Sequence, residues 1–304
     1  MRIGTHLIAS GAVTVEQLRA DAAAVRGLDS AWTNQQPGGW DPLGVLSSFA
    51  DAPPELGTAV VPTYPQHPAT LATSALTVQA LTGGRLTLGI GPSHELAMTG
   101  WLGIPYTAPA RHTREYLEVL RPLLRGEHVR HSGEFFTVDT QVAIKAPEPP
   151  VLLAALGPRM LEVARDLADG TIAVWARPAL VTDYLVPRLA PNSRIAAMVM
   201  VAVTDDPDAA RDSIAREFGA AGQLPAYRAM LDRGGLSSVA DTVVAGDETF
   251  VLKEIQRYRD AGVTDFVATT VGPQERLPAV LAEAKSAYSP LSRLSTMSFP
   301  MVPR

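Results

Sequence analysis

Small and polar residues gather directly after a predicted strand over residues 85–90, in the order Gly89-Ile90-Gly91-Pro92-Ser93-His94. A predicted strand over residues 56–61 precedes it, and a helix that begins at Pro68 and stops at Gly83-Gly84 joins the two. Two strands joined by one helix are expected to be parallel, with a right-handed crossover. The residues after both strands then lie where parallel α/β folds bind ligands. The pattern predicts a ligand site here, although glycines after strands also form ordinary turns.

The spacing Gly89-x-Gly91-x-x-His94 resembles a dinucleotide-binding fingerprint that lacks two of its parts. That fingerprint needs a third glycine for close helix–strand packing and an acidic residue about twenty positions later for the ribose. Here His94 takes the place of the third glycine, and Arg111 stands near the acidic position. Both departures argue against a Rossmann-type dinucleotide site.

A second candidate site is the segment Gly157-Pro158-Arg159-Met160, which separates a predicted buried strand over residues 151–155 from a helix that extends to Ala168. Pro158 is pre-set for the first turn of a helix, and Gly157 permits close approach of a ligand. The free N–H groups of this turn and the positive end of the helix dipole form an anion site. The same residues also fit an ordinary helix start, and both interpretations stay open.

Two glutamines, Gln35 and Gln36, follow the predicted strand over residues 28–33. Neither side chain titrates, so neither can act as a general base. Both can donate hydrogen bonds to a cofactor or to a substrate carbonyl. The candidate catalytic residues are therefore Gln35, Gln36 and His94, the last of which is either a direct contact or a solvated loop residue.

The sequence offers little support for other catalytic chemistry. It contains no cysteine, which excludes disulfides, thiolate catalysis and cysteine-ligated metals. His128 and His131 have no carboxylate partner in a metal-ligand pattern, and neither G-x-S-x-G nor H-E-x-x-H occurs, so we predict no metal site. Four other side chains fit either the core or the wall of a pocket near the strand ends: His6, Trp32, Trp101 and Trp175.

The composition argues against a nucleic-acid partner. Of the 304 residues, 46% are apolar, and the formal net charge is −5 with no dense run of Lys or Arg. Met1 leads directly into a predicted strand without a signal segment, and no apolar run reaches the ~18 residues of a membrane span. We therefore expect a cytoplasmic protein that does not contact membranes.

Eight strand candidates, each followed by a helix or a loop, predict a (β/α)8 TIM barrel. They cover residues 3–8, 28–33, 56–61, 85–90, 151–155, 171–175, 195–203 and 265–269. We predict one barrel domain over residues 1–289 and a tail over 290–304. The segment 127–150 reads as a hairpin or loop insertion after the fourth strand–helix unit. Between the last two strands, the pattern predicts a helical segment from Pro207 to about Asp232 and a loop over 234–247.

The run from Leu56 to His94 resembles the luciferase-like monooxygenase superfamily, and especially its actinobacterial F420-dependent branch. Later segments extend the resemblance in family order over nearly the whole chain: Ala108–Arg111 with Glu115–Leu117, Leu153–Pro158, Val244–Glu248 and Ala261–Phe266. The resemblance implies an oxidoreductase that uses coenzyme F420, acts on a small-molecule substrate and assembles as a homodimer. An FMN-dependent monooxygenase and a non-catalytic flavin-binding paralogue are the alternatives.

The resemblance also implies roles for individual residues. It places the cofactor ring beside Gly91, Pro92, Ser93 and His94, over a non-proline cis peptide bond between Thr58 and Ala59, with Val61 at the ring edge. It places the cofactor's phosphate and tail at Ala155, Leu156, Gly157, Pro158, Arg159 and Met160, with Arg111 either at the phosphate or on the surface. Some sugar-phosphate-oxidising relatives carry an Asp-His pair where this chain has Gln35-Gln36. That departure favours reduction of an activated C=C, C=N or C=O bond.

Overall fold

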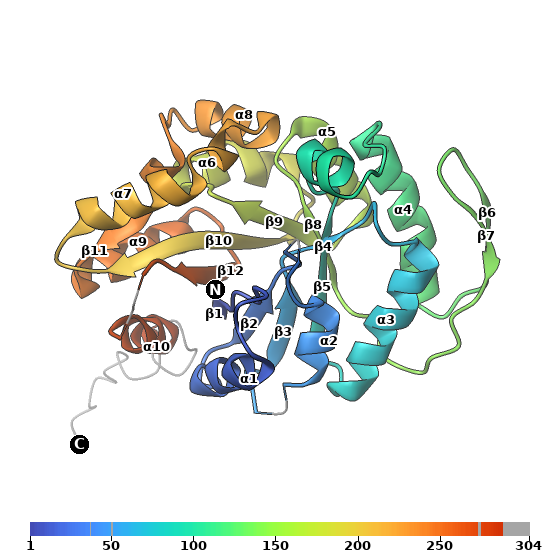
Figure 1. Cartoon of the computed structure of the whole chain (residues 1–304), viewed down its shortest axis with the longest axis horizontal. Coiled ribbons are helices and arrows are strands. Elements are labelled where there is room, and N and C mark those ends of the chain that lie inside the picture. The colour runs from blue at the N-terminus through green and yellow to red at the C-terminus, as the bar shows by residue number, and fades with distance from the viewer. Residues whose placement is uncertain (37, 50, 273–274, 288–304) are drawn as a thin grey trace, which may run out of the picture.

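Eight parallel strands close into a barrel at the centre of the molecule (Figure 1). In ring order they are β1 (Arg2–His6), β2 (Ser30–Thr33), β3 (Glu55–Thr58), β5 (Leu86–Gly91), β8 (Val151–Ala154), β9 (Gly170–Val174), β10 (Arg194–Val203) and β12 (Asp265–Thr270), and β12 pairs with β1. Two short strands extend the wall: β4 (Val61–Pro62) pairs with β5, and β11 (Val244–Gly246) pairs with β10. The predicted (β/α)8 barrel is confirmed.

The structure is a computed structural model that describes residues 1–36, 38–49, 51–272 and 275–287. The tail predicted over residues 290–304 lies outside these ranges. Because all neighbouring barrel strands are parallel, their carboxyl ends share one end of the barrel, which is where this architecture binds ligands.

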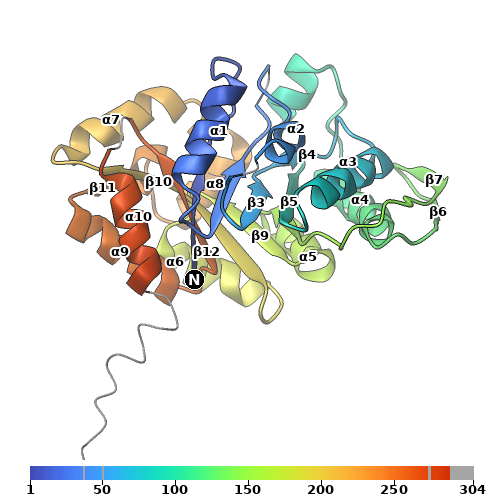
Figure 2. The same ribbon diagram turned by 90° about the horizontal axis from the view of Figure 1, so that it is seen from below.

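Helices surround the barrel (Figure 2). They are α1 (Val15–Ala24), α2 (Pro42–Ser47), α3 (Pro68–Leu81), α4 (Pro109–Leu124), α5 (Pro158–Leu167), α6 (Pro178–Leu180), α7 (Pro207–Phe218), α8 (Pro225–Arg233), α9 (Glu248–Asp260) and α10 (Leu277–Ala287), with a π-helical turn over Leu96–Trp101 after β5. Most begin at a proline, whose missing N–H has no partner to lose in a first turn. No helix within the described ranges combines the length and the apolar character that a membrane span requires.

The segment between β10 and β12 corrects two predictions. The single helical segment predicted from Pro207 to about Asp232 is two helices, because α7 ends at Phe218 and α8 begins only at Pro225. The loop predicted over 234–247 contains β11, whose residues Val244 and Ala245 are buried against β10. A strand of three residues is too short to produce a periodic signal.

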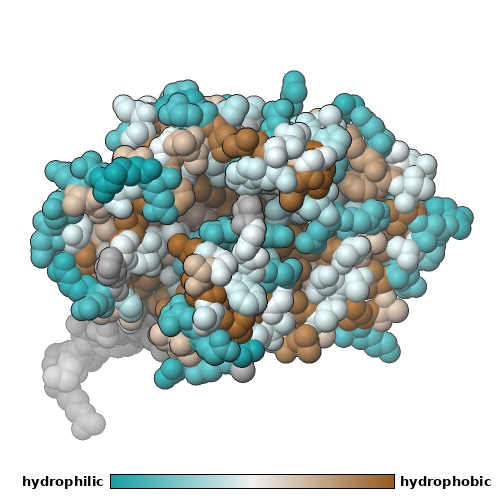
Figure 3. All heavy atoms as spheres, viewed as in Figure 1, coloured by the Kyte–Doolittle hydropathy of each residue, from teal (hydrophilic) through white to brown (hydrophobic). Residues whose placement is uncertain are grey.

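The segment between α4 and β8 forms an antiparallel hairpin of β6 (Val129–Ser132) and β7 (Thr137–Thr140), which makes a sheet of its own. It lies beyond α4 at the edge of the molecule, where its surface is hydrophilic (Figures 1 and 3). The buried carboxylate of Glu115 on α4 fixes its turn by accepting hydrogen bonds from the N–H groups of residues 134–136 and from His131. Burial acts to raise the pKa of Glu115, but these hydrogen bonds outweigh it and lower the pKa.

The barrel interior is filled around the indole of Trp32, which is fully buried. Trp32 packs with Ile172, Met198 and Val267, and its Nε1 donates to the hydroxyl of Ser30 at 2.8 Å. A Cβ atom at Gly57 on the next strand would lie 2.2 Å from the ring, so the indole fits only because that position is glycine. Trp32 is therefore a core residue below the barrel mouth.

Candidate active site

The third barrel strand is interrupted by a cis peptide bond between Ala59 and Val60. The prediction of a non-proline cis bond between Thr58 and Ala59 is therefore wrong by one residue. The reason is that Thr58 stays in the strand ladder opposite Thr33. Its hydroxyl also donates to the carbonyl of Gly89 and accepts from that residue's N–H, at 2.7 and 2.8 Å. These two hydrogen bonds hold Thr58 in the strand, so the interruption of the strand follows Thr58.

A cavity of about 260 Å³ lies at the carboxyl ends of the strands, beside the cis bond. Its walls include eight of the residues predicted for the site: Ala59, Gly91, Pro92, Ser93, His94, Leu156, Gly157 and Met160. Eight further residues complete its lining: Val60, Tyr106, Pro109, Ala154, Ile172, Val174, Ala226 and Tyr227. The structure thus brings the loop after β5 and the start of α5 together around one space, as the two sequence patterns suggest separately.

Three predicted contacts do not line this cavity. Thr58 is fully buried, with its hydroxyl bonded to Gly89. Val61, expected at the ring edge, is 1% exposed and packs in the core, while Val60 lines the cavity. Ala155 is likewise fully buried in the core, and Ala154 lines the cavity instead. Successive strand residues face opposite sides of the sheet, so an error of one residue moves a side chain from the cavity to the helical layer.

A second, open hollow of about 790 Å³ adjoins the cavity, with which it shares Pro109, Gly157 and Met160. It is lined by Ala108–Arg111 at the start of α4 and by Gly157–Met160 at the start of α5. The predicted Pro158 and Arg159 lie here. A Cβ atom built on Gly157 meets nothing within 4 Å, so open space faces the first turn of α5.

Two arginines flank this hollow. Arg111 forms an exposed ion pair with Glu134 of the hairpin turn at 2.9 Å. Arg159 is exposed, and it makes no ion pair with any residue in the described ranges. The N-terminus of α5 and Arg159 favour an anionic group in this hollow, which Arg111 also lines although Glu134 pairs with its charge.

The cavity itself contains no charged side chain among the described residues that line it. Burial lowers the pKa of His94, so its imidazole is uncharged at neutral pH. Burial raises the pKa of Tyr227 to about 12, and burial together with Tyr64 and Glu95 raises that of Tyr106 to about 12. The cavity therefore suits a neutral group rather than an ion.

Sequence reasoning missed two aromatic residues that line the cavity, Tyr106 and Tyr227. Tyr227 on α8 lies 4.7 Å from the His94 ring and 4.3 Å from that of Trp175, measured between ring centroids. Tyr106 donates its hydroxyl to the carbonyl of Ser93 at 3.1 Å. Pro225 is the signal that α8 starts near Tyr227, but nothing in the sequence indicates that α8 reaches the barrel mouth. Trp101, in contrast, is 59% exposed and contributes no wall.

The glutamines after β2 lie next to the cis bond without being in the cavity wall. The N–H of Gln35 donates to the carbonyl of Val60 at 3.3 Å, which fixes the loop against the interrupted strand. The Oε1 atom of Gln35 is buried and has no hydrogen-bond partner. The carbonyl of Gln36 accepts from Gly39. In the ranges that the structure describes, no cluster of three His, Asp or Glu residues is arranged to hold a metal ion.

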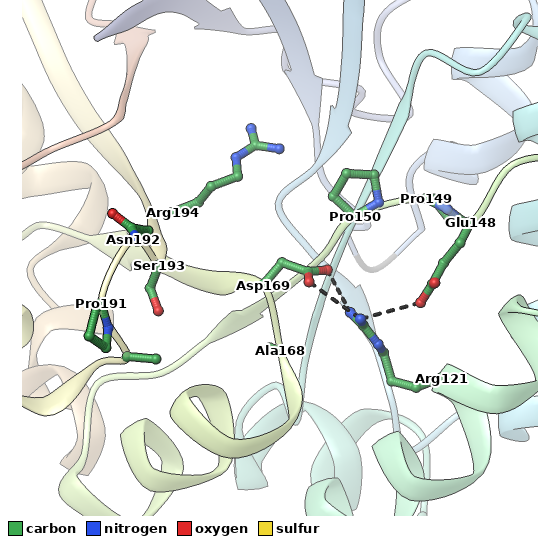
Figure 4. A pocket seen from close by; sticks show the side chains of 11 residues that line it. Arg121, Glu148, Pro149, Pro150, Ala168, Asp169, Pro191, Asn192, Ser193 and Arg194 are labelled. Atoms are coloured by element: carbon green, nitrogen blue, oxygen red, sulfur yellow. Dashed lines mark hydrogen bonds and ion pairs between the residues drawn. The ribbon is translucent and has the colours of Figure 1, made fainter.

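A third hollow, of about 530 Å³, lies at the opposite end of the barrel, before β8, β9 and β10. Arg121 points to Asp169 and Glu148 there, and its charge is neutralised by both (Figure 4). This hollow lies at the amino ends of the strands, where barrel residues usually serve stability rather than ligand binding.

Comparison with known proteins agrees with this geometry. A sequence model of the luciferase-like monooxygenase family matches residues 2–265. The chain is 28% identical over 268 residues to the 5,10-methylenetetrahydromethanopterin reductase of Archaeoglobus fulgidus, a match that covers 73% of this chain and 79% of that protein.

Two solved structures show the same fold. An F420-dependent secondary alcohol dehydrogenase in complex with an F420-acetone adduct aligns with a TM-score of 0.76 at 19% identity, over 95% of this chain and 99% of that one. The oxygenating constituent of the 3,6-diketocamphane monooxygenase of Pseudomonas putida, in complex with FMN, aligns with a TM-score of 0.66 at 15% identity, over 94% of this chain and 96% of that one. Since the family model spans most of its length, the chain belongs to the luciferase-like monooxygenase family.

Proposed function

We propose that this protein is an F420-dependent oxidoreductase that transfers hydride between the deazaflavin and a small organic substrate, reducing an activated double bond. The observation that carries the proposal is a charge-free cavity that opens into a positive hollow. A deazaflavin cofactor has the matching parts, since its ring is flat and aromatic and its tail is anionic. The F420-dependent secondary alcohol dehydrogenase among the solved structures of this fold supports the same assignment.

The residues present fit such a cofactor. Val60, Gly91 and His94 would border the ring, and the N–H groups at the start of α5, with Arg159 and Arg111, would hold the phosphate and tail. The unpaired Oε1 of Gln35 supplies an acceptor beside the cis bond, and a ring N–H is a suitable donor to it. A bound deazaflavin supplies the hydride.

This chain's own groups favour reduction over oxidation of an alcohol. Gln35 and Gln36, which stand where some relatives carry a titratable pair, cannot remove a hydroxyl proton. Reduction of an activated double bond needs no resident base, because water can protonate the product. The glutamines then serve to bind and orient, and Tyr227 and Tyr106 line the cavity without supplying a base.

An FMN-dependent monooxygenase is the second candidate, since FMN also has a flat ring and a phosphate. The FMN complex among the solved structures of this fold favours it. A non-catalytic flavin-binding protein would share the cavity and show no turnover.

We predict that the purified protein binds F420 with a stoichiometry of one per chain and a lower dissociation constant than for FMN. The reason is that the tail of F420 carries more negative charge toward the hollow at Arg111 and Arg159. Changes in cofactor absorbance or fluorescence on titration measure both constants. Tight binding of FMN without binding of F420 contradicts the assignment and favours the monooxygenase, whereas binding without turnover of enones, imines or ketones favours the non-catalytic protein.

We also propose that the protein is a homodimer that buries α3. This surface helix contains no charged residue, and its exposed positions are Thr70, Thr73, Thr77, Ala80 and Leu81. Leu81 is 68% exposed in the single chain. Light scattering at micromolar concentration should report a dimer for the native chain and a monomer for Thr77→Glu/Leu81→Glu. A native monomer under these conditions contradicts the proposal.

A further inference from the structure

A chain of hydrogen bonds crosses three neighbouring strands at the barrel mouth. His6 at the end of β1 pairs in the ladder with Thr269 of β12 and with Trp32 of β2. Its Nε2 lies 3.1 Å from the Oδ1 of Asn34, and its Nδ1 lies 3.4 Å from the hydroxyl of Thr269. The three polar side chains therefore form one connected row.

The chemistry of these groups fixes the direction of the row. Burial lowers the pKa of His6 to about 4, although the hydrogen bond with Asn34 acts in the opposite direction, so the imidazole is neutral at neutral pH. Asn34 Oδ1 only accepts, so the ring proton must be on Nε2. The Nδ1 atom then accepts from the hydroxyl of Thr269. This arrangement leaves Thr269 as donor, His6 as relay and Asn34 as the end of the row.

The open end of the row is the amide nitrogen of Asn34. Its two N–H groups have no hydrogen-bond partner among the described residues, while its oxygen is bound to His6. The side chain is also not among the buried groups that lack partners, so its nitrogen is accessible. Two fixed donors are thus presented at the barrel mouth.

Asn34 lies next to the cavity wall. The two backbone hydrogen bonds that flank it join Thr33 to Ala59 at 2.7 Å and Gln35 to Val60 at 3.3 Å, and Ala59 and Val60 line the cavity. Asn34 is two residues after Trp32, whose ring fills the barrel interior, so strand alternation directs both side chains toward the barrel axis. The amide therefore lies above the indole, on the side where a substrate would approach the cofactor ring.

We propose that Asn34 binds the substrate by donating from its amide to a neutral acceptor, a carbonyl oxygen or an imine nitrogen, and that His6 is the positioning residue that fixes this amide. The proposal rests on the proposed function, because the acceptor belongs to the double bond that receives the hydride. A hydrogen bond to that atom withdraws electron density and favours hydride addition at the conjugated carbon.

The charge-free surroundings exclude a carboxylate at this position. No charged side chain lines the adjoining cavity among the described residues, and His6 and His94 are both held neutral by burial. An anion here would lose its hydration without a cation to replace it, which is costly. The substrate class is therefore neutral enones, unsaturated amides, ketones or imines.

The sequence allows a direct test, because it contains only two asparagines, Asn34 and Asn192. Protein with ¹⁵N in the asparagine side chains should give two amide signals, and Asn192 at the opposite end of the barrel is the internal control. The variants Asn34→Asp and Asn192→Asp assign them. The probes are cyclohexenone, which carries a neutral acceptor, and cyclohexenecarboxylate, which has the same ring and a negative charge.

We expect cyclohexenone to shift the Asn34 signals, cyclohexenecarboxylate to leave them in place, and neither probe to move those of Asn192. His6→Ala should weaken the cyclohexenone titration about fivefold or more, the loss typical of one hydrogen bond, and His6→Gln should recover part of it. The proposal is overturned if cyclohexenone does not shift the Asn34 signals, or if it shifts them with the same affinity in His6→Ala as in the native protein. The cofactor titration is read separately, so failure to bind F420 defeats the proposed function without deciding the role of Asn34.

Discussion

Replacing Arg194 with methionine should lower the free energy of unfolding by about 3–5 kcal/mol, the range found when one partner of a buried ion pair is removed. Arg194 lies at the start of β10, and its Nη2 donates to Glu55 at 2.5 Å and to Asp265 at 2.8 Å. Asp265 is 1% exposed, so it cannot recover its hydration when the guanidinium is lost. Arg2 also binds both carboxylates, but its side chain is 38% exposed and cannot replace the buried charge.

Urea denaturation followed by circular dichroism measures this loss as a lower midpoint with an unchanged slope. Arg216→Met is the matched control, because Arg216 is exposed on α7 and has no ion pair within the described ranges, and it should change stability by less than about 0.5 kcal/mol.

A triple variant separates pairing from burial. Arg194→Met combined with Glu55→Leu and Asp265→Leu removes the three buried charges and leaves Arg2, which is 38% exposed and can be hydrated. Apolar groups can replace a buried ionic cluster at little net cost. It should therefore be more stable than Arg194→Met alone. If Arg194→Met and Arg216→Met are equally stable, the ion pairs of Arg194 with Glu55 and Asp265 contribute nothing to the stability of the barrel.

The barrel was predictable because its signals are local and repeated. A strand such as β10 is apolar and buried along nearly its whole length. Most helices have a proline in the first turn, which marks where they begin in the sequence. The break between α7 and α8 has a signal in Pro225, but the helical character of the flanking residues conceals it. Short β11 carries no periodic signal, because its pairing with β10 is decided by tertiary contacts.

The site was predictable only in part. The rule that ligands bind at the carboxyl ends of parallel strands selects the loop after β5 and the start of α5, and both line the cavity. This rule cannot tell at which residue the third strand is interrupted, because that position depends on the hydrogen bonds between Thr58 and Gly89. Nor can it find Tyr227, which a helix from a distant part of the chain carries to the barrel mouth, or the partnership of His6 and Asn34.

Replacing Gly157 with glutamate should weaken binding of F420, and of FMN, at least 100-fold while leaving the fold intact. Gly157 has an extended backbone conformation, φ −94°, that any residue adopts, and the space beside it is open, so the larger side chain fits without strain. The new carboxylate would stand at the N-terminus of α5, in the hollow proposed for the cofactor's phosphate. It would occupy the free N–H groups and repel a second anion, and like charges about 4 Å apart cost several kcal/mol near a protein surface. Titration followed by cofactor absorbance measures the loss.

Two variants separate charge from bulk and from a general charge effect. Gly157→Ala adds only a Cβ atom that meets nothing within 4 Å, so it should bind within a few-fold of the native protein. Gly27→Glu adds the same charge at another glycine that faces open space, after α1, and should leave affinity unchanged. Thermal melting should be similar for all three, because no buried contact is lost. If Gly157→Glu binds the cofactor with native affinity, the phosphate binds elsewhere, because a phosphate cannot share that turn with a carboxylate. The proposal that the start of α5 binds the phosphate would then have to be abandoned.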